Sequence, residues 1–86
     1  MLYSAPDAAL DLRITVQNDE CVVAGQVIRE GCTSATVEIS GPTGSAQARS
    51  SELCEFTLPA VPVGNYSLLV KMFDIEIEIS ELELKD

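Results

Sequence analysis

The sequence contains no histidine, so it lacks the side chain that most often serves as a general base near neutral pH. A serine or cysteine nucleophile would need an unusually shifted carboxylate or lysine to activate it instead. Without histidine, a zinc site built on the cysteines would also lack its usual fourth ligand. We therefore expect no catalytic residues, no metal site and no cofactor in this chain.

Basic residues are scarce. Five Lys and Arg side chains stand against 14 Asp and Glu, which gives a formal net charge of −9. A protein of this charge is repelled by nucleic acid phosphates and by anionic membrane surfaces. No apolar run approaches the roughly 20 residues of a membrane span, and the N-terminus lacks the basic start and apolar run of a secretory signal. We expect no nucleic acid partner, no membrane association and a cytoplasmic location.

Cysteines are few, and tryptophan is absent. Cys21, Cys32 and Cys54 form neither a C-x-x-C pair nor an even set. This pattern favours buried or half-buried free thiols in a reducing compartment. The alternative is one disulfide with one thiol left over.

Sugar binding is disfavoured too, because only four aromatic residues are present and two of them, Phe56 and Tyr66, are expected in the core.

Hydrophobic residues make up 47% of the 86 residues, and aliphatic and β-branched types dominate them. This composition suffices for one compact core and disfavours disorder. We expect one domain over residues 10–86, preceded by a flexible leader or linker over residues 1–9.

Alternation of apolar and polar residues from Leu10 to Gln17 predicts a half-buried strand. Turn formers at residues 18–20 separate it from an apolar run over residues 21–28, which predicts an antiparallel hairpin. Further strands are expected over residues 35–40, 45–50, 55–58 and 66–72, and in a last strand from residue 75. In that last strand the apolar set shifts by one position at Ser80, as a β-bulge requires. The pattern predicts an all-β, antiparallel Greek-key β-sandwich of about seven strands.

Four segments, in order, resemble the carboxypeptidase regulatory-like family, a group of transthyretin-like and Ig-like sandwiches. They are Val23–Val27, Ala35–Ile39, Cys54–Leu58 and Pro62–Leu68. Cys54 stands where the family usually has glycine. The resemblance implies a non-catalytic domain in which Tyr66 buries its ring and bonds nearby backbone through its hydroxyl. Tyr3 and residues 11–14 resemble features found in small bacterial versions of this domain, which are associated with signalling and regulatory systems.

Strand parity predicts an apolar surface patch. If Val23 faces inward, then Val22 and Ile28 face outward, and the same parity sends Leu69 and Phe73 outward. These four side chains would form one interaction patch if their strands share a sheet. We therefore expect a protein-interaction or assembly module that binds a protein partner or itself, through this patch or by strand addition to an unpaired edge. A passive structural domain of a larger protein is the alternative.

Acidic residues crowd the C-terminal segment, at Asp74, Glu76, Glu78, Glu81, Glu83 and Asp86. Calcium prefers such oxygen ligands, which makes a calcium-binding or other ligand-binding sandwich a second alternative. Side chains at alternate strand positions are spaced about 6.6–6.8 Å apart and project in parallel, however, so a solvated acidic face is favoured.

Overall fold

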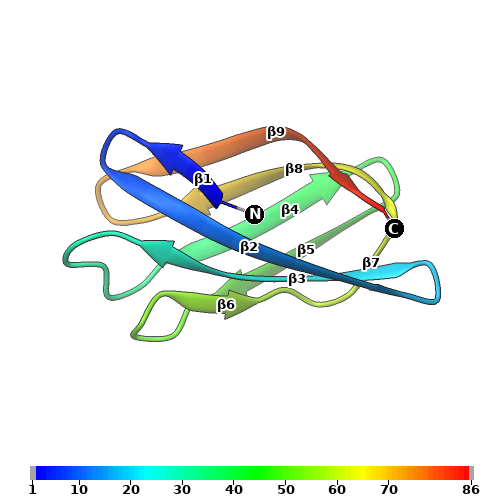
Figure 1. Ribbon diagram of the computed structural model, residues 1–86, viewed down its shortest axis with the longest axis horizontal. Helices are drawn as coiled ribbons and strands as arrows, with labels where there is room; N and C mark the ends of the chain where they lie inside the picture. The colour runs from blue at the N-terminus through cyan, green and yellow to red at the C-terminus, as the bar shows by residue number, and fades with distance from the viewer. Residues whose placement is uncertain (1, 86) are drawn as a thin grey trace.

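The computed structural model describes residues 2–85, and in this range the chain forms strands and no helix (Figure 1). The strands are β1 (Leu2–Ala5), β2 (Ala8–Gln17), β3 (Glu20–Ile28), β4 (Thr36–Gly41), β5 (Gly44–Arg49), β6 (Glu55–Thr57), β7 (Val61–Pro62), β8 (Gly64–Lys71) and β9 (Glu76–Leu84). The all-β prediction is therefore confirmed. The count of about seven strands differs from the structure because β1 and the two-residue β7 were not foreseen.

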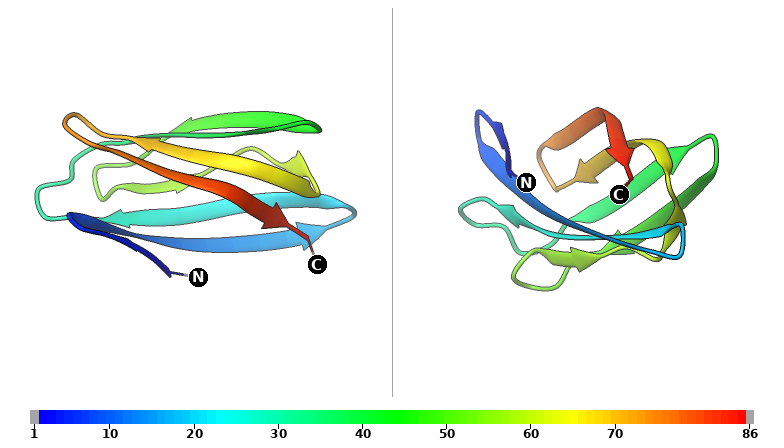
Figure 2. Two further views of the ribbon diagram at one scale, coloured as in Figure 1. Left: turned by 90° about the horizontal axis from the view of Figure 1, so that it is seen from above. Right: turned by 45° about the vertical axis from the view of Figure 1, so that its right-hand side comes forward.

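The strands form two antiparallel sheets that lie as two layers (Figure 2). Sheet A has the order β1-β2-β3-β6, and β7 also pairs with β3. Sheet B has the order β5-β4-β8-β9. Consequently β1 and β6 lie at the edges of the first sheet, and β5 and β9 at the edges of the second.

The core lies between the two sheets, and alternating positions of both sheets supply it. Along β3 the residues Cys21, Val23, Gly25 and Val27 are buried, while their neighbours are exposed or half-buried. The remaining buried hydrophobic residues are Leu10, Leu12, Ala35, Val37, Ile39, Cys54, Phe56, Leu58, Val61, Tyr66, Leu68, Val70, Leu82 and Leu84. The predicted inward parity of β3 and β8 is thus confirmed.

Two predicted local features are confirmed by the backbone. Asn18 and Asp19 both have positive φ, at 54° and 64°, and form the turn of the predicted hairpin between β2 and β3. Glu20, which was expected in this turn, is the first residue of β3. Between β8 and β9, Tyr66 lies opposite Leu82 and Leu68 lies opposite Ile79, so β9 has one more residue than β8 in this interval. Glu81 takes a φ of 62° at this bulge, which lets both apolar sets of β9 face the core.

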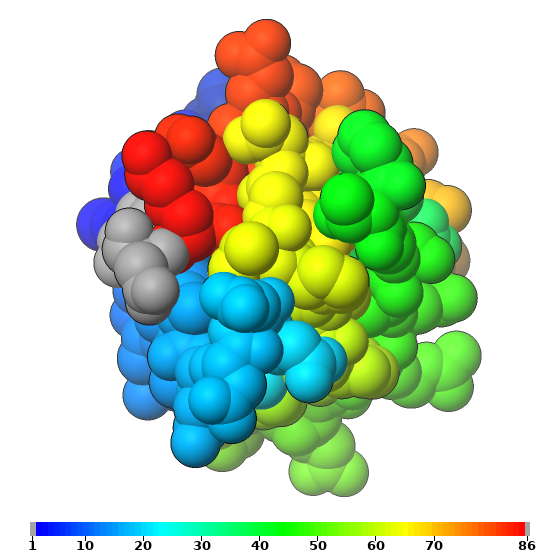
Figure 3. All heavy atoms as spheres, turned by 90° about the vertical axis from the view of Figure 1, so that its right-hand side faces the viewer, coloured from blue at the N-terminus to red at the C-terminus, as the bar shows by residue number. Residues whose placement is uncertain are grey.

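Tyr66 holds the chain reversal before β8. Its side chain is buried, and its hydroxyl donates a hydrogen bond to the carbonyl oxygen of Pro62 at 2.6 Å. Thr43 Oγ1, in the turn between β4 and β5, lies 3.0 Å from the same hydroxyl. Figure 3 shows that the β2–β3 turn in light blue, the yellow segment leading into β8 and the green β4–β5 turn close this end of the molecule together. The predicted role of Tyr66 is confirmed.

The expected leader over residues 1–9 is corrected by the structure. Met1 lies outside the described residues, but Leu2–Ala5 pairs with β2 in register from Leu2 opposite Asp11 to Ala5 opposite Ala8. Pro6 and Asp7 form the turn between the two strands. The segment is too short to show a reliable alternation, so its pairing with the edge of β2 could not be read from the sequence pattern.

Candidate functional site

The predicted apolar patch does not form as one surface. Val22 and Ile28 lie on β3 in sheet A, whereas Leu69 lies on β8 in sheet B, and Phe73 follows β8 in the turn toward β9. Val22 and Ile28 are also about 20 Å apart along their strand. The parity was right, but the patch required β3 and β8 to share a sheet. Phe73 is fully exposed, Ile28 is 50% exposed and Leu69 is half-buried.

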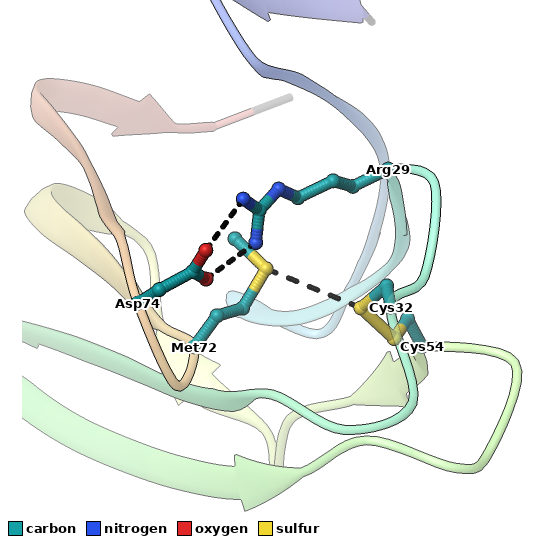
Figure 4. Close-up of polar contacts among 5 residues, drawn as sticks. All are labelled: Arg29, Cys32, Cys54, Met72 and Asp74. Atoms are coloured by element: carbon teal, nitrogen blue, oxygen red, sulfur yellow. Dashed lines mark hydrogen bonds and ion pairs between the residues drawn. A yellow bond between two sulfur atoms is a disulfide. The ribbon is translucent and has the colours of Figure 1, made fainter.

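One end of the molecule is tied together by contacts between loops (Figure 4). Arg29, just after β3, donates two hydrogen bonds to the carboxylate of Asp74 in the β8–β9 turn, one of them 2.8 Å long between Nη2 and Oδ2. These hydrogen bonds lower the pKa of Asp74 and raise that of Arg29. The hollow between the two loops measures about 410 Å³. Because Arg29 and Asp74 already neutralise each other, neither offers an unpaired charge to a ligand in this hollow.

A disulfide joins Cys32 to Cys54, so the favoured prediction of free thiols was wrong and the alternative of one disulfide with one thiol left over is confirmed. Cys54 is buried and has a φ of 59°, the left-handed conformation that glycine would adopt most easily. Cys32 Sγ also contacts Met72 Sδ at 4.0 Å. Cys21 is buried in the core and lies outside the disulfide. The pairing was not foreseeable from spacing, because it depends on how two distant loops meet.

The acidic residues of β9 do not converge. Glu76 and Glu78 project from alternate positions of the strand and are exposed, Glu81 lies in the bulge, and Asp74 is occupied by Arg29. Asp86 lies outside the described residues. Within residues 2–85, no group of three or more His, Cys, Asp or Glu side chains is placed to hold a metal ion.

A groove that the sequence did not predict separates β1 from β9. It is lined on one side by Tyr3, Ser4, Ala5 and Ala8 from the β1–β2 hairpin, and on the other by Glu76, Ile77, Glu78 and Ile79 from β9. In the right-hand view of Figure 2 the hairpin rises beside β9. Tyr3, Ile77 and Ile79 are half-buried and pack against the core, so they give the groove an apolar floor. Its volume is about 260 Å³, below the roughly 300–1,000 Å³ of small-molecule pockets.

Both walls of this groove are strand edges. Over residues 2–85, β1 pairs only with β2, and β9 pairs only with β8. Met72 N donates to Ile75 O at 2.9 Å, so these two residues form a hydrogen-bonded pair. In an antiparallel ladder every second pair is hydrogen-bonded, which makes the pairs of Ile77 and Ile79 with β8 the next two. The backbone N–H and C=O groups of Ile77 and Ile79 therefore point toward β8, and those of Glu76 and Glu78 point toward the open edge.

The only signal for this groove in the sequence was the alternation of Ile75, Ile77 and Ile79 with acidic residues, which predicted the strand but not its position at an edge. Comparison of the chain with models of protein families, with curated proteins and with solved structures finds no match. No helix within residues 2–85 is long and apolar enough to span a membrane.

Proposed function

We propose that this domain is a non-catalytic protein-interaction module that binds an extended segment of a partner by strand addition at the edge of β9. The groove between β1 and β9 carries this proposal. It combines an apolar floor with backbone donors and acceptors of Glu76 and Glu78 that point toward an open edge. Strand addition uses both features, since backbone hydrogen bonds give affinity and side-chain pockets give specificity.

We also propose that the fold is a Greek-key sandwich of the carboxypeptidase regulatory-like type, and the buried Tyr66 with its hydrogen bond to Pro62 supports this assignment. Domains of that type beside metallocarboxypeptidases are non-catalytic.

The disulfide bears on where the module works. Disulfides persist in oxidising compartments and are rare in the cytosol. The Cys32–Cys54 bond therefore supports an oxidising environment rather than the cytoplasm that the cysteine pattern favoured. Mass spectrometry of the native protein after thiol blocking tests this point, because a cytoplasmic form would carry blocking groups on Cys32 and Cys54.

The test of strand addition is selection of peptides from a displayed random library on the wild-type protein, followed by amide hydrogen exchange. In the free protein the amide of Ile77 is bonded to β8 and should exchange slowly, whereas the amide of Glu78 should exchange rapidly. A bound strand should slow the exchange of Glu78. The Glu78→Pro variant removes the donor at the open edge without removing one from β8, so it should lose binding.

The matched control is Glu78→Gln, which keeps the backbone donor and should retain a large part of the binding. A library that yields no specific peptide would overturn the proposal and favour a passive structural domain. Peptides that bind without slowing the exchange of Glu78 would also overturn it. The exchange measurement on the wild-type protein needs no substitution, so a loss of stability in Glu78→Pro would not obscure the result.

A further inference from the structure

We infer that the segment bound in the β1–β9 groove alternates aliphatic and basic residues, with its basic side chains beside Glu76 and Glu78. This inference rests on the proposed function and adds the chemistry of the partner. It follows from the two faces that an added strand would share with β9, one facing the core and one facing solvent.

The inner face requires aliphatic residues. Ile77 and Ile79 turn their side chains toward the core side of the groove, where Tyr3 and Ala8 line the opposite wall. Residues paired with Ile77 and Ile79 would project onto the same face and cover this floor. A polar side chain there would lose water without a hydrogen-bonding partner from the apolar floor, which disfavours it.

The outer face requires positive charge. Glu76 and Glu78 are exposed and lie about 6.8 Å apart, at alternate positions of the strand. In the register of β8 and β9, Lys71 lies opposite Glu76 and Leu69 lies opposite Glu78. Lys71 Nζ lies 3.5 Å from Glu38 Oε1, and Arg29 is paired with Asp74. The ion pairs found in residues 2–85 include neither Glu76 nor Glu78. Glu76 therefore shares the nearby Lys71 with Glu38, and Glu78 has the uncharged Leu69 opposite it, so this edge keeps an excess of negative charge.

An acidic or identical strand is disfavoured by the same charges. Pairing of β9 with β9 of a second copy would bring glutamates to within about 5 Å of one another across the new ladder, where like charges are destabilising. The edge strand β1 carries no basic residue, and β5 carries only Arg49. A contact between β5 and β9 of different copies would also be heterologous, and it would produce open assemblies unless its rotation closed a ring. A basic segment of another protein is the better fit.

The experiment compares four synthetic peptides of equal length by calorimetry and by amide exchange at Glu78. The first alternates Lys with Val and Ile, and the second and third replace each Lys by Gln or Glu. The fourth has the composition of the first but groups its lysines at one end, which measures nonspecific attraction to a protein of charge −9. The first peptide should bind most tightly and should slow the exchange of Glu78, and 500 mM salt should weaken it.

The protein variant Glu76→Gln/Glu78→Gln should bind the first peptide about 3- to 10-fold more weakly, because each cross-strand pair of opposite charge contributes modestly. The control variant Glu52→Gln/Glu55→Gln removes two exposed carboxylates and the same net charge at the β6 edge of sheet A, three strand spacings (about 14 Å) from β1. Its affinity should change less than about 2-fold, since exposed charges more than a Debye length away are screened.

The outcomes separate this inference from the proposed function. Equal binding of the Lys and Gln peptides, both lost in Glu78→Pro, would overturn the basic partner and leave strand addition standing. Equal binding of the first and fourth peptides would show nonspecific attraction and would overturn the inference. Concentration-dependent assembly of the domain that Glu78→Pro abolishes would assign the edge to a second copy. If no peptide slows the exchange of Glu78, and the library also yields none, both proposals fail.

Discussion

Reduction of the Cys32–Cys54 disulfide should destabilise the domain strongly, because the bond closes a long loop in a small protein. The two cysteines are separated by 22 residues. In the chain-entropy model, opening a loop of this length returns about 3 kcal/mol of conformational free energy to the unfolded chain. For an 86-residue domain, whose unfolding entropy is about 2.1 cal/mol/K per residue, that loss lowers the melting temperature by about 15–20 °C.

The assay is thermal unfolding followed by circular dichroism, with and without a phosphine reductant, after mass spectrometry has shown complete reduction. The variant Cys32→Ala/Cys54→Ala should melt at the same temperature in both conditions. Cys21→Ala should keep the full difference between them, because Cys21 lies outside the disulfide. A decrease of less than about 5 °C in the fully reduced protein would refute the argument that loop closure stabilises this fold.

Three further predictions concern single side chains. Tyr66→Phe removes the hydrogen bond to the carbonyl of Pro62 and should lower the free energy of unfolding in urea by about 1–2 kcal/mol; an unchanged midpoint would mean that the bond is not needed. Gly25→Ala should lower the free energy of unfolding by about 1–3 kcal/mol in the same measurement, because its new Cβ would meet the backbone of β2. If this variant were as stable as the wild type, β2 would be able to move away at little cost. The pKa of Asp74 should lie below its ordinary value of 3.8, mainly because of the hydrogen bonds from Arg29. At pH values above 3.8 this ion pair stabilises the folded protein, and the stabilisation is lost as the pH falls through the lower pKa of the folded state. The lowered pKa should appear in the pH titration of the Asp74 carboxyl carbon chemical shift in the wild-type protein. If Arg29→Met left the midpoint of that titration unchanged, Arg29 would not be the cause of the lowered pKa.

Local sequence patterns accounted for much of the fold because strand pairing and turn chemistry are local. The alternation from Leu10 to Gln17 and the turn formers after it predicted a hairpin that the structure contains. The change of parity at Ser80 predicted the bulge, since no regular strand can bury both Ile79 and Leu82. By contrast, β1 carries too few residues to show a period, and it was expected to belong to a leader.

The candidate site depended on relations between segments that no local pattern contains. The outward orientation of Val22 and Leu69 was predicted correctly, but the predicted patch is not present in the structure. Alternation along a strand shows which face of its sheet a residue occupies, and it does not show which sheet the strand joins. The groove arose from two edges that meet only after both sheets have packed. Cys32 and Cys54 likewise meet because their loops converge at one end of the molecule.

The amino-acid sequence alone thus determined the strand-rich class, the main hairpins, the bulge, the buried Tyr66 and the acidic face of β9, because each depends on alternation, turn propensity or charge over a few neighbouring residues. Only the tertiary structure decided which strands are edges, which cysteines pair and where an apolar floor stays open. These depend on contacts between residues far apart in the chain, and the stability of such contacts comes from the packing of the whole core.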